Sequence, residues 1–192
     1  MNHEQSYPLN ESKTIIVLTT GFEEIEALAT IDILRRGDVN ICSVSLTGDR
    51  TVTGSRQISV IADDLFEEID FTNVQMLILP GGSGTVKMNE HHGLSREILV
   101  HARKRKLLAA ICAAPMILGR LGLLQGKKAT CYPGYEQYLI GAELADESVV
   151  VSDHITTASA AGFTFDFALE LLAQLKGKDV ADKVASKILF TV

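Results

Sequence analysis

Short, continuous apolar runs recur along the chain, and each is bounded by polar or glycine-rich residues. Residues 14–18 read Thr-Ile-Ile-Val-Leu, residues 76–79 read Met-Leu-Ile-Leu, and residues 107–111 form a third such run. Each run is too short for a helix and too uniformly apolar for a strand with one wet face, so it predicts a strand buried on both faces. Segments with helical spacing of apolar residues lie between them. This alternation predicts an α/β fold built on parallel strands.

The helical segments carry recognisable end signals. Residues 23–36 have acids in the first turn and Arg35 and Arg36 in the last, as the helix dipole favours, and Gly37 supplies the stop. Further helices are expected over residues 94–104, 114–121, 163–175 and 180–189, and extended segments over residues 41–46, 51–61 (strand or hairpin), 129–132, 149–151 and 155–157. We therefore predict a doubly wound, mostly parallel sheet with helices on both faces, in which ligands bind outside the carboxyl ends of the strands.

The length of 192 residues suits one domain, which would bury roughly 70% of the surface of the unfolded chain. We find no internal repeat or linker, so we predict a flexible N-terminal tail over residues 1–12 and a single domain over residues 13–192. The tail is polar and holds no apolar stretch that could serve as a signal peptide. No later run approaches the length of a membrane span, so we expect no membrane association.

Charge and cysteine content exclude further classes of protein. Eighteen Lys and Arg against 24 Asp and Glu give a net charge of −6, which disfavours nucleic-acid binding. The basic run 103–106 ends a predicted helix and is expected to be solvated. The odd, widely spaced set of three cysteines predicts reduced thiols, no metal site and a cytoplasmic protein. Surface or structural roles are expected for all five histidines: His3, His91, His92, His101 and His154.

Acidic residues follow the first buried strand, over residues 21–26. Such acids can simply decorate a helix N-terminus, where the dipole favours negative charge. Glu26 stands apart because it lies three residues after Glu23, where its side chain can point back over the strand ends. Spacing alone does not decide whether it does so.

The second loop, residues 80–84, reads Pro-Gly-Gly-Ser-Gly after another buried strand. It lacks both the G-K-[ST] ending and the G-x-G-x-x-G pattern, so a nucleotide is not indicated. Consecutive glycines let backbone N–H groups approach a bound oxygen closely, which fits an oxyanion pocket. A tight strand-to-helix turn explains the same residues equally well.

The third loop surrounds Cys112 with small residues at a strand-to-helix junction, over residues 109–115. This is the pattern of a nucleophile elbow, and a helix N-terminus just beyond it favours a thiolate. The alternative is a buried, inert cysteine, since free cysteine is among the most buried residue types.

Taken together, the loops resemble the ThiJ/PfpI superfamily, in the branch of the Parkinsonism-associated protein DJ-1 and the bacterial ThiJ-like proteins. The matching motifs are, in order, Gly21-Phe-Glu-Glu-Ile-Glu26, Arg35-Arg36, Gly54-Ser-Arg56, Leu79-Pro-Gly-Gly82, Ala109-Ala-Ile-Cys-Ala-Ala-Pro115, Phe165-Asp-Phe-Ala-Leu169 and Gly177-Lys-Asp-Val-Ala181. The resemblance implies a flavodoxin-like, class I glutamine amidotransferase-like fold.

The resemblance also assigns roles to residues. It implies that Cys112 is the nucleophilic, oxidation-sensitive cysteine and that Glu26 is the protonated acid that hydrogen-bonds its thiolate. Burial beside a thiolate raises the pKa of a carboxyl, so such a proton assignment is physically consistent. The resemblance places Gly81, Gly82 and Ala113, with the Cys112 N–H, around an oxyanion.

Some positions depart from the family pattern. Tyr132 stands where the family has a histidine, and a tyrosine hydroxyl donates a hydrogen bond but is a poor base at neutral pH. We assign it to the substrate pocket. The later loop, residues 157–162, lacks the arginine and proline common there. Cys131 is interpreted as structural, with a resolving-thiol role as the alternative.

The activity implied by the resemblance is that of a cofactor-independent cysteine enzyme. It would convert 2-oxoaldehydes such as methylglyoxal and glyoxal, or their early adducts on glycated proteins, to 2-hydroxy acids, as glutathione-independent glyoxalases and deglycases do. The alternative is an oxidative-stress sensor or redox-regulated chaperone that uses oxidation of Cys112. The resemblance further implies a homodimer built around the first helix and Arg35. Because Ala113 rather than histidine follows Cys112, the peptidase branch is disfavoured.

Overall fold

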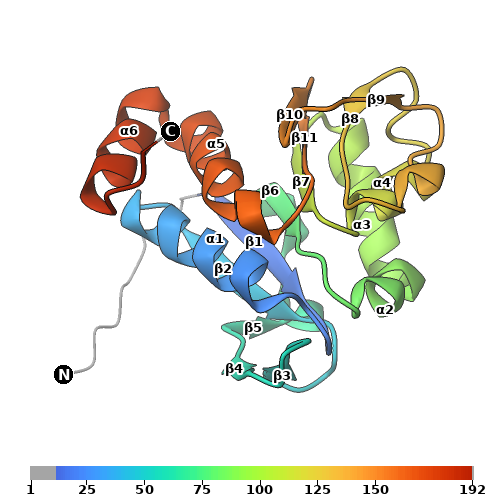
Figure 1. Cartoon of the computed structure of the whole chain (residues 1–192). Helices are drawn as coiled ribbons and strands as arrows, with labels where there is room; N and C mark the ends of the chain where they lie inside the picture. Colours follow the sequence, from blue (N-terminus) through green and yellow to red (C-terminus); the bar gives the residue numbers. More distant parts are fainter. Residues whose placement is uncertain (1–11, 192) are drawn as a thin grey trace.

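A seven-stranded sheet forms the centre of the computed structural model, which describes residues 12–191 (Figure 1). Residues 1–11 of the predicted tail lie outside the described residues. The sheet order is β10-β11-β7-β6-β1-β2-β5, and every neighbouring pair is parallel except the antiparallel pair β10 and β11. Its strands are β1 (Lys13–Leu18), β2 (Ile41–Ser45), β5 (Asp64–Leu65), β6 (Val74–Leu79), β7 (Leu107–Ile111), β10 (Val149–Ser152) and β11 (Ile155–Ala158). The predicted mostly parallel α/β fold is confirmed.

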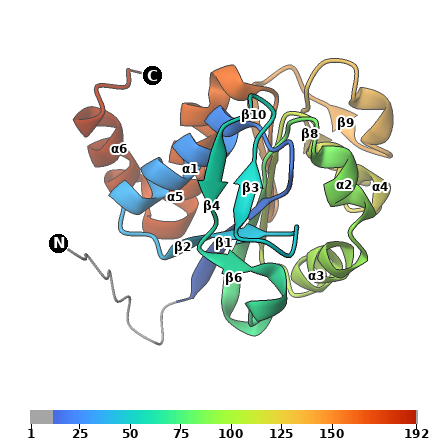
Figure 2. The ribbon, with the colours of Figure 1, turned by 90° about the horizontal axis from the view of Figure 1, so that it is seen from below.

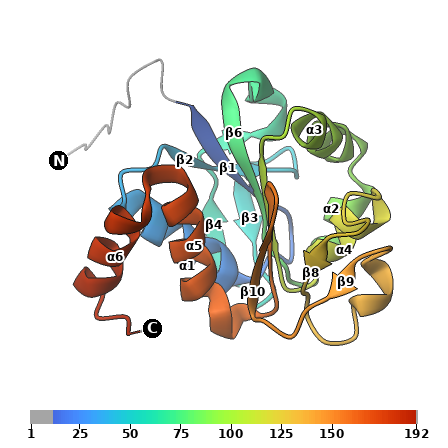
Figure 3. The same ribbon diagram turned by 90° about the horizontal axis from the view of Figure 1, so that it is seen from above.

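Helices cover both faces of the sheet (Figures 1 and 3). One face carries α1 (Glu24–Arg36), α5 (Thr164–Lys176) and α6 (Lys178–Lys187), and the other carries α2 (Thr85–Glu90), α3 (His92–Arg103) and α4 (Pro115–Arg120). Each face has its own apolar core, so the side chains of β1 alternate between the two: Ile16 faces one core and Ile15 the other. This explains why β1 reads as an uninterrupted apolar run.

The hairpin expected as one alternative over residues 51–61 is confirmed, since β3 (Thr51–Thr53) pairs with β4 (Ser59–Ile61) in a separate antiparallel sheet. Several other small elements were not predicted, among them the pairing of β8 (Lys128–Ala129) with β9 (Glu143–Leu144). Short 3-10 helices are η1 (Phe66–Glu68), η2 (Phe71–Asn73), η3 (Glu136–Tyr138) and η4 (Ala161–Phe163). The extended segment expected over residues 129–132 is wrong beyond Ala129, and α2 went unpredicted. Elements of two to six residues are too short to show a sequence period, which accounts for these differences.

The reversal of strand order between β1 and β6 creates the crevice of a doubly wound sheet. The loops that follow these two strands bind each other there: the Glu23 N–H donates to the Gly81 carbonyl at 3.0 Å, and the Gly84 N–H to the Gly21 carbonyl at 2.8 Å. The β3–β4 hairpin lies in the same region, between α1 and α2 in the view from below (Figure 2).

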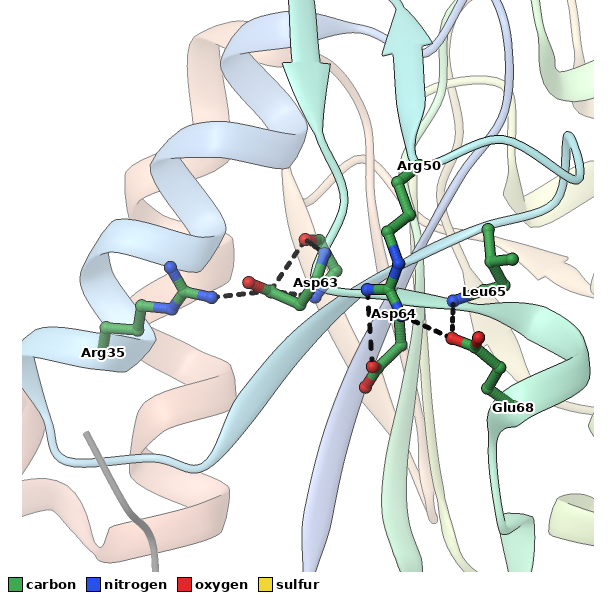
Figure 4. Close-up of polar contacts among 7 residues, drawn as sticks. Arg35, Arg50, Asp63, Asp64, Leu65 and Glu68 are labelled. Atoms are coloured by element: carbon green, nitrogen blue, oxygen red, sulfur yellow. Dashed lines mark hydrogen bonds and ion pairs between the residues drawn. The ribbon is translucent and has the colours of Figure 1, made fainter. Parts of the chain in front are cut away.

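Asp63 fixes the edge of the sheet beside β2 (Figure 4). Its Oδ2 atom accepts from Arg35 at 2.7 Å and from both the N–H and the hydroxyl of Ser43, each at 2.8 Å. Arg50 makes a second tie, with its guanidinium 2.6 Å from Glu68 and 3.7 Å from Asp64. Together these contacts hold the two-residue strand β5 against β2.

The basic run at the end of α3 is solvated only in part. Arg103 and Lys104 are exposed, as predicted. The prediction is wrong for Lys106, whose ammonium group donates to the carbonyls of Thr72 and Val74 at 2.8 and 2.7 Å. Lys106 thus joins the start of β6 to the start of β7.

Among residues 12–191, no helix is long and apolar enough to cross a membrane.

His101 on α3 is fully buried, and its Nδ1 lies 3.2 Å from the Glu97 carbonyl. Burial and the nearby charge of Lys106 lower the pKa of His101 from 6.5 to about 4. A depressed histidine pKa means that the unfolded chain binds the proton more readily than the folded chain. The stability due to neutral His101 is therefore complete above pH 6.5 and is lost as pH falls toward 4.

We predict that the free energy of unfolding falls by up to about 3 kcal/mol between pH 6.5 and pH 4 because of His101. Urea denaturation at a series of pH values measures this, with His101→Gln lacking the titration and exposed His92→Gln as the matched control. A wild type and a His101→Gln variant that lose stability in parallel over this range would contradict the prediction.

Candidate active site

Cys112 ends β7 in a strained backbone conformation. Its φ of +64° lies in the left-handed region, which non-glycine residues rarely adopt. The surrounding chain holds it there, since its N–H donates to the Ala158 carbonyl at 2.9 Å and its carbonyl accepts from the Tyr132 N–H at 2.8 Å. This is the backbone geometry of a nucleophile elbow, as the sequence predicted.

The side chain of Glu26 does point back over the strand ends. It is 1% exposed, and its Oε2 atom accepts from the Gly81 N–H at 2.8 Å. Glu23 caps the helix by accepting from the Glu26 N–H at 2.8 Å, which fixes the first turn. The carboxyl lies beside the Cys112 thiol, and each group shifts the pKa of the other. Its Oε1 atom is buried and has no hydrogen-bond partner among residues 12–191.

Gly81 leaves just enough room for this pair. A Cβ at Gly81 would lie 2.7 Å from the Cys112 Cβ, 2.8 Å from Glu26 Oε2 and 3.1 Å from Cys112 Sγ. Gly82 has a φ of +96°, and a Cβ there would lie 2.4 Å from the Gly21 carbonyl. Both glycines are therefore required by close approach, and the N–H groups of Gly82 and Ala113 can face the thiol.

Burial controls the charge of the pair. Desolvation raises the pKa of Glu26 to about 7. The hydrogen bond from the Gly81 N–H favours the ionised carboxyl and so acts in the opposite direction. Desolvation and the charge of Glu26 raise the pKa of Cys112 to about 12. The N–H groups of Ala113 and Gly82 lower this pKa, but by less. Two interacting groups titrate as one unit, so between these limits the pair carries one negative charge and one proton.

The sequence predicts that a helix N-terminus favours a thiolate at Cys112, and the structure adds the effect of Glu26 on that thiol. Helix α4 has six residues, and Cys112 cannot ionise freely while Glu26 is charged. A thiolate requires that the remaining proton sit on the Glu26 carboxyl. The donors to sulfur from Gly82 and Ala113 favour that arrangement.

The other predicted residues contribute less directly. Tyr132 is 47% exposed, and its backbone N–H donates to the Cys112 carbonyl. Cys131 is buried, and burial raises the pKa of its thiol to about 11, which fits a structural role. Cys42 is likewise free, and burial raises its pKa. Within residues 12–191, no group of three or more His, Cys, Asp or Glu side chains could hold a metal ion.

One participant was not predicted. The carboxyl of Glu24 is buried beside the site, with 5% of the residue exposed, and accepts from the Arg56 N–H at 2.6 Å. The Gly54-Ser-Arg56 motif was noted in the sequence, but nothing in its spacing places it against the first turn of a helix about 30 residues earlier. Long-range contacts of this kind carry no local signal.

Comparisons with known proteins agree with the geometry. The DJ-1/PfpI family model matches residues 12–174. Protein DJ-1 homolog A of Arabidopsis thaliana is 34% identical over 183 residues, covering 93% of this chain and 47% of that protein. Protein DJ-1alpha of Drosophila melanogaster is 33% identical over 181 residues, covering 92% and 83% of the two chains. The chain thus spans less than half of the Arabidopsis relatives, 47% and 41% of their lengths.

A third relative carries the name of an activity, and a solved structure shares the fold. Glutathione-independent glyoxalase DJR-1.2 of Caenorhabditis elegans is 26% identical over 171 residues, covering 88% of this chain and 91% of that protein. The structure of oxidised Toxoplasma gondii DJ-1 superposes with a TM-score of 0.90 at 31% identity, covering 94% of this chain and all of that one.

We predict that Gly81→Ala lowers the rate of Cys112 alkylation by iodoacetamide about tenfold or more, because the new methyl group separates the thiol from Glu26. Intact-mass spectrometry at neutral pH measures the rate. Gly162→Ala is the matched control, since a Cβ there meets nothing within 4 Å. Equal rates for both variants would contradict the close-packed pair.

Proposed function

Because the chain belongs to the DJ-1/PfpI family, in its branch of DJ-1 homologues, we propose that it is a cofactor-independent cysteine enzyme for 2-oxoaldehydes. Its substrates would be methylglyoxal, glyoxal or their early adducts on glycated proteins, and its products 2-hydroxy acids. The observation that carries the proposal is the buried Glu26 carboxyl held against the Cys112 thiol at a nucleophile elbow. The relative named as a glutathione-independent glyoxalase supports the substrate class.

In the first step, Cys112 Sγ forms a bond to the aldehyde carbon. The carbonyl oxygen gains the electron pair and takes the proton from the Glu26 carboxyl, which gives a neutral hemithioacetal and a carboxylate. The N–H groups of Gly82 and Ala113 stabilise the charge that develops on oxygen. A group poised near pH 7 suits both directions of proton transfer, and the pKa of Glu26 is raised to about 7.

The later steps need no external oxidant. The Glu26 carboxylate removes the proton on the former aldehyde carbon, and the resulting carboxylic acid returns it to the neighbouring carbon of the enediolate. The hydroxyl proton of the hemithioacetal moves to the oxygen on that neighbouring carbon. The aldehyde carbon is oxidised to a thioester while the ketone carbon is reduced to an alcohol. Water then hydrolyses the thioester, which releases the 2-hydroxy acid and regenerates the thiol. For methylglyoxal the balance is one water consumed and one lactate formed.

Three wider expectations belong to this proposal. A homodimer around α1 would place Arg35 at the interface, and 42% of its side chain remains exposed although it binds Asp63. A cytoplasmic location suits three free thiols. Tyr132 would line the substrate pocket through its exposed ring.

We predict that the wild-type protein forms lactate from methylglyoxal without glutathione, and that Cys112→Ser abolishes the reaction because the alcohol is a far weaker nucleophile than the thiolate. Enzymatic lactate determination measures turnover, with Cys131→Ser as the matched control that keeps activity. Turnover by the wild type no greater than that of Cys112→Ser would overturn the proposal.

A second candidate function uses the same residues. Oxidation of Cys112 to a sulfinate held by Glu26 and the neighbouring N–H groups would make the protein an oxidative-stress sensor or redox-regulated chaperone. The oxidised form of the Toxoplasma gondii relative favours this candidate.

The sensor candidate predicts selective addition of two oxygen atoms at Cys112 under mild peroxide, because a shared charge makes this thiol more nucleophilic than the buried Cys131. Peptide mass spectrometry locates the oxygen atoms. Absent oxidation, or oxidation spread evenly over Cys42, Cys112 and Cys131, would count against a sensor.

A further inference from the structure

The turn of the β3–β4 hairpin is bound to the loop that leads into α1. Four hydrogen bonds make this connection: Gly21 N–H to the Thr53 carbonyl at 2.8 Å, Ser55 N–H to the Phe22 carbonyl at 2.8 Å, Ser55 hydroxyl to the Gly21 carbonyl at 2.6 Å, and Arg56 N–H to Glu24 Oε1 at 2.6 Å. The hairpin pairs with no strand of the central sheet. A two-stranded hairpin is marginally stable alone, so these contacts stabilise both partners.

Glu24 supplies the carboxyl group of this connection. Its side chain is buried, Oε1 accepts from the Arg56 N–H, and Oε2 is buried without a hydrogen-bond partner among residues 12–191. Burying an incompletely bonded carboxyl costs free energy. An aliphatic side chain would pack at this position without that cost in free energy. We therefore attribute the buried carboxyl to a role in positioning the hairpin turn.

Gly54 shows how closely the hairpin fits this carboxyl. A Cβ at Gly54 would lie 2.4 Å from Glu24 Oε1 and 2.5 Å from its carboxyl carbon. The backbone at Gly54 has no positive φ, so close approach to Glu24 is the constraint on this glycine. The turn and the carboxyl therefore occupy mutually fixed positions.

Glu24 and Glu26 share the first turn of α1, and the carboxyl of Glu26 depends on the position of that turn. Its Oε2 atom accepts from the Gly81 N–H at 2.8 Å, and a Cβ at Gly81 would lie 2.8 Å from this oxygen and 3.1 Å from Cys112 Sγ, so the arrangement tolerates little displacement. Glu23 holds the turn from one side through the Gly81 carbonyl. Glu24 holds it from the hairpin side.

We propose that Glu24 is a positioning residue, whose buried carboxyl locks the β3–β4 turn to the first turn of α1 and so holds Glu26 against Cys112. This inference rests on the proposed function in one respect, that Cys112 works together with Glu26. Glu24 itself touches no reacting atom. It acts through the geometry of its neighbour in the helix.

The test is the pH profile of Cys112 alkylation by iodoacetamide, followed by intact mass. Glu24→Ala should raise the midpoint by about half a pH unit or more, toward that of Glu26→Gln, because a displaced Glu26 no longer shares a proton with the thiol. Glu24→Gln keeps an oxygen that accepts from Arg56 and should restore the wild-type midpoint. Glu67→Ala, an exposed acid on η1, controls for loss of one negative charge.

A double-mutant cycle with Gly54 tests the contact itself. Gly54→Ala should shift the midpoint in the same direction, since the methyl group displaces the Glu24 carboxyl. The Gly54→Ala, Glu24→Ala double variant should be no worse than the more affected single variant, because the clash is gone. Additive shifts would overturn a shared mechanism.

A purely structural role gives a different result. Glu24→Ala would then lower the melting temperature and leave the alkylation midpoint of the folded protein at the wild-type value, which overturns the proposal. A Glu26→Gln profile equal to the wild type also overturns it. Alkylation does not involve an aldehyde, so a missing lactate activity with shifted alkylation profiles would reject the substrate and keep the positioning role.

Discussion

The half-buried Cys112 thiol and the buried Glu26 carboxyl lie side by side, where desolvation disfavours two negative charges. Each group raises the cost of ionising the other, and burial adds to both. The result is a pair that carries one charge and one proton near neutrality. Every other feature of the site serves this pair: Gly81 gives it room and one donor, while Gly82 and Ala113 supply donors to the sulfur. The proposed chemistry needs a nucleophile and an acid together, which a shared proton supplies.

The topology of the sheet makes this meeting possible. Glu26 follows β1, Gly81 follows β6 and Cys112 follows β7, and these three strands are adjacent and parallel, so their carboxyl ends meet at one edge. Apolar cores on both faces fix the strands, and the left-handed backbone at Cys112 is held by hydrogen bonds to its neighbours. The β3–β4 hairpin adds a support from outside the sheet, through Glu24. The close contacts of the site are therefore made between strands and loops that lie far apart in the sequence.

Much of this architecture follows from local sequence signals. The apolar run at residues 14–18 is β1 because both of its faces are covered, and the small residues around Cys112 mark the elbow. Two-residue strands such as β5 have no periodicity and depend on Asp63 and its partners instead. The direction of the Glu26 side chain and the contact of Glu24 with the hairpin depend on tertiary packing, which residue spacing does not encode.

We infer that Cys112 gains its charge near neutrality because Glu26 retains the proton. A pH titration of the ultraviolet absorbance of the thiolate tests it most directly, taken as the difference between the wild type and Cys112→Ser so that other groups cancel. We expect one thiolate that appears near neutrality, where the pair gives up its first proton. A thiolate that appears only in the strongly alkaline range, as burial and an ionised Glu26 would impose on Cys112, would contradict this proton assignment.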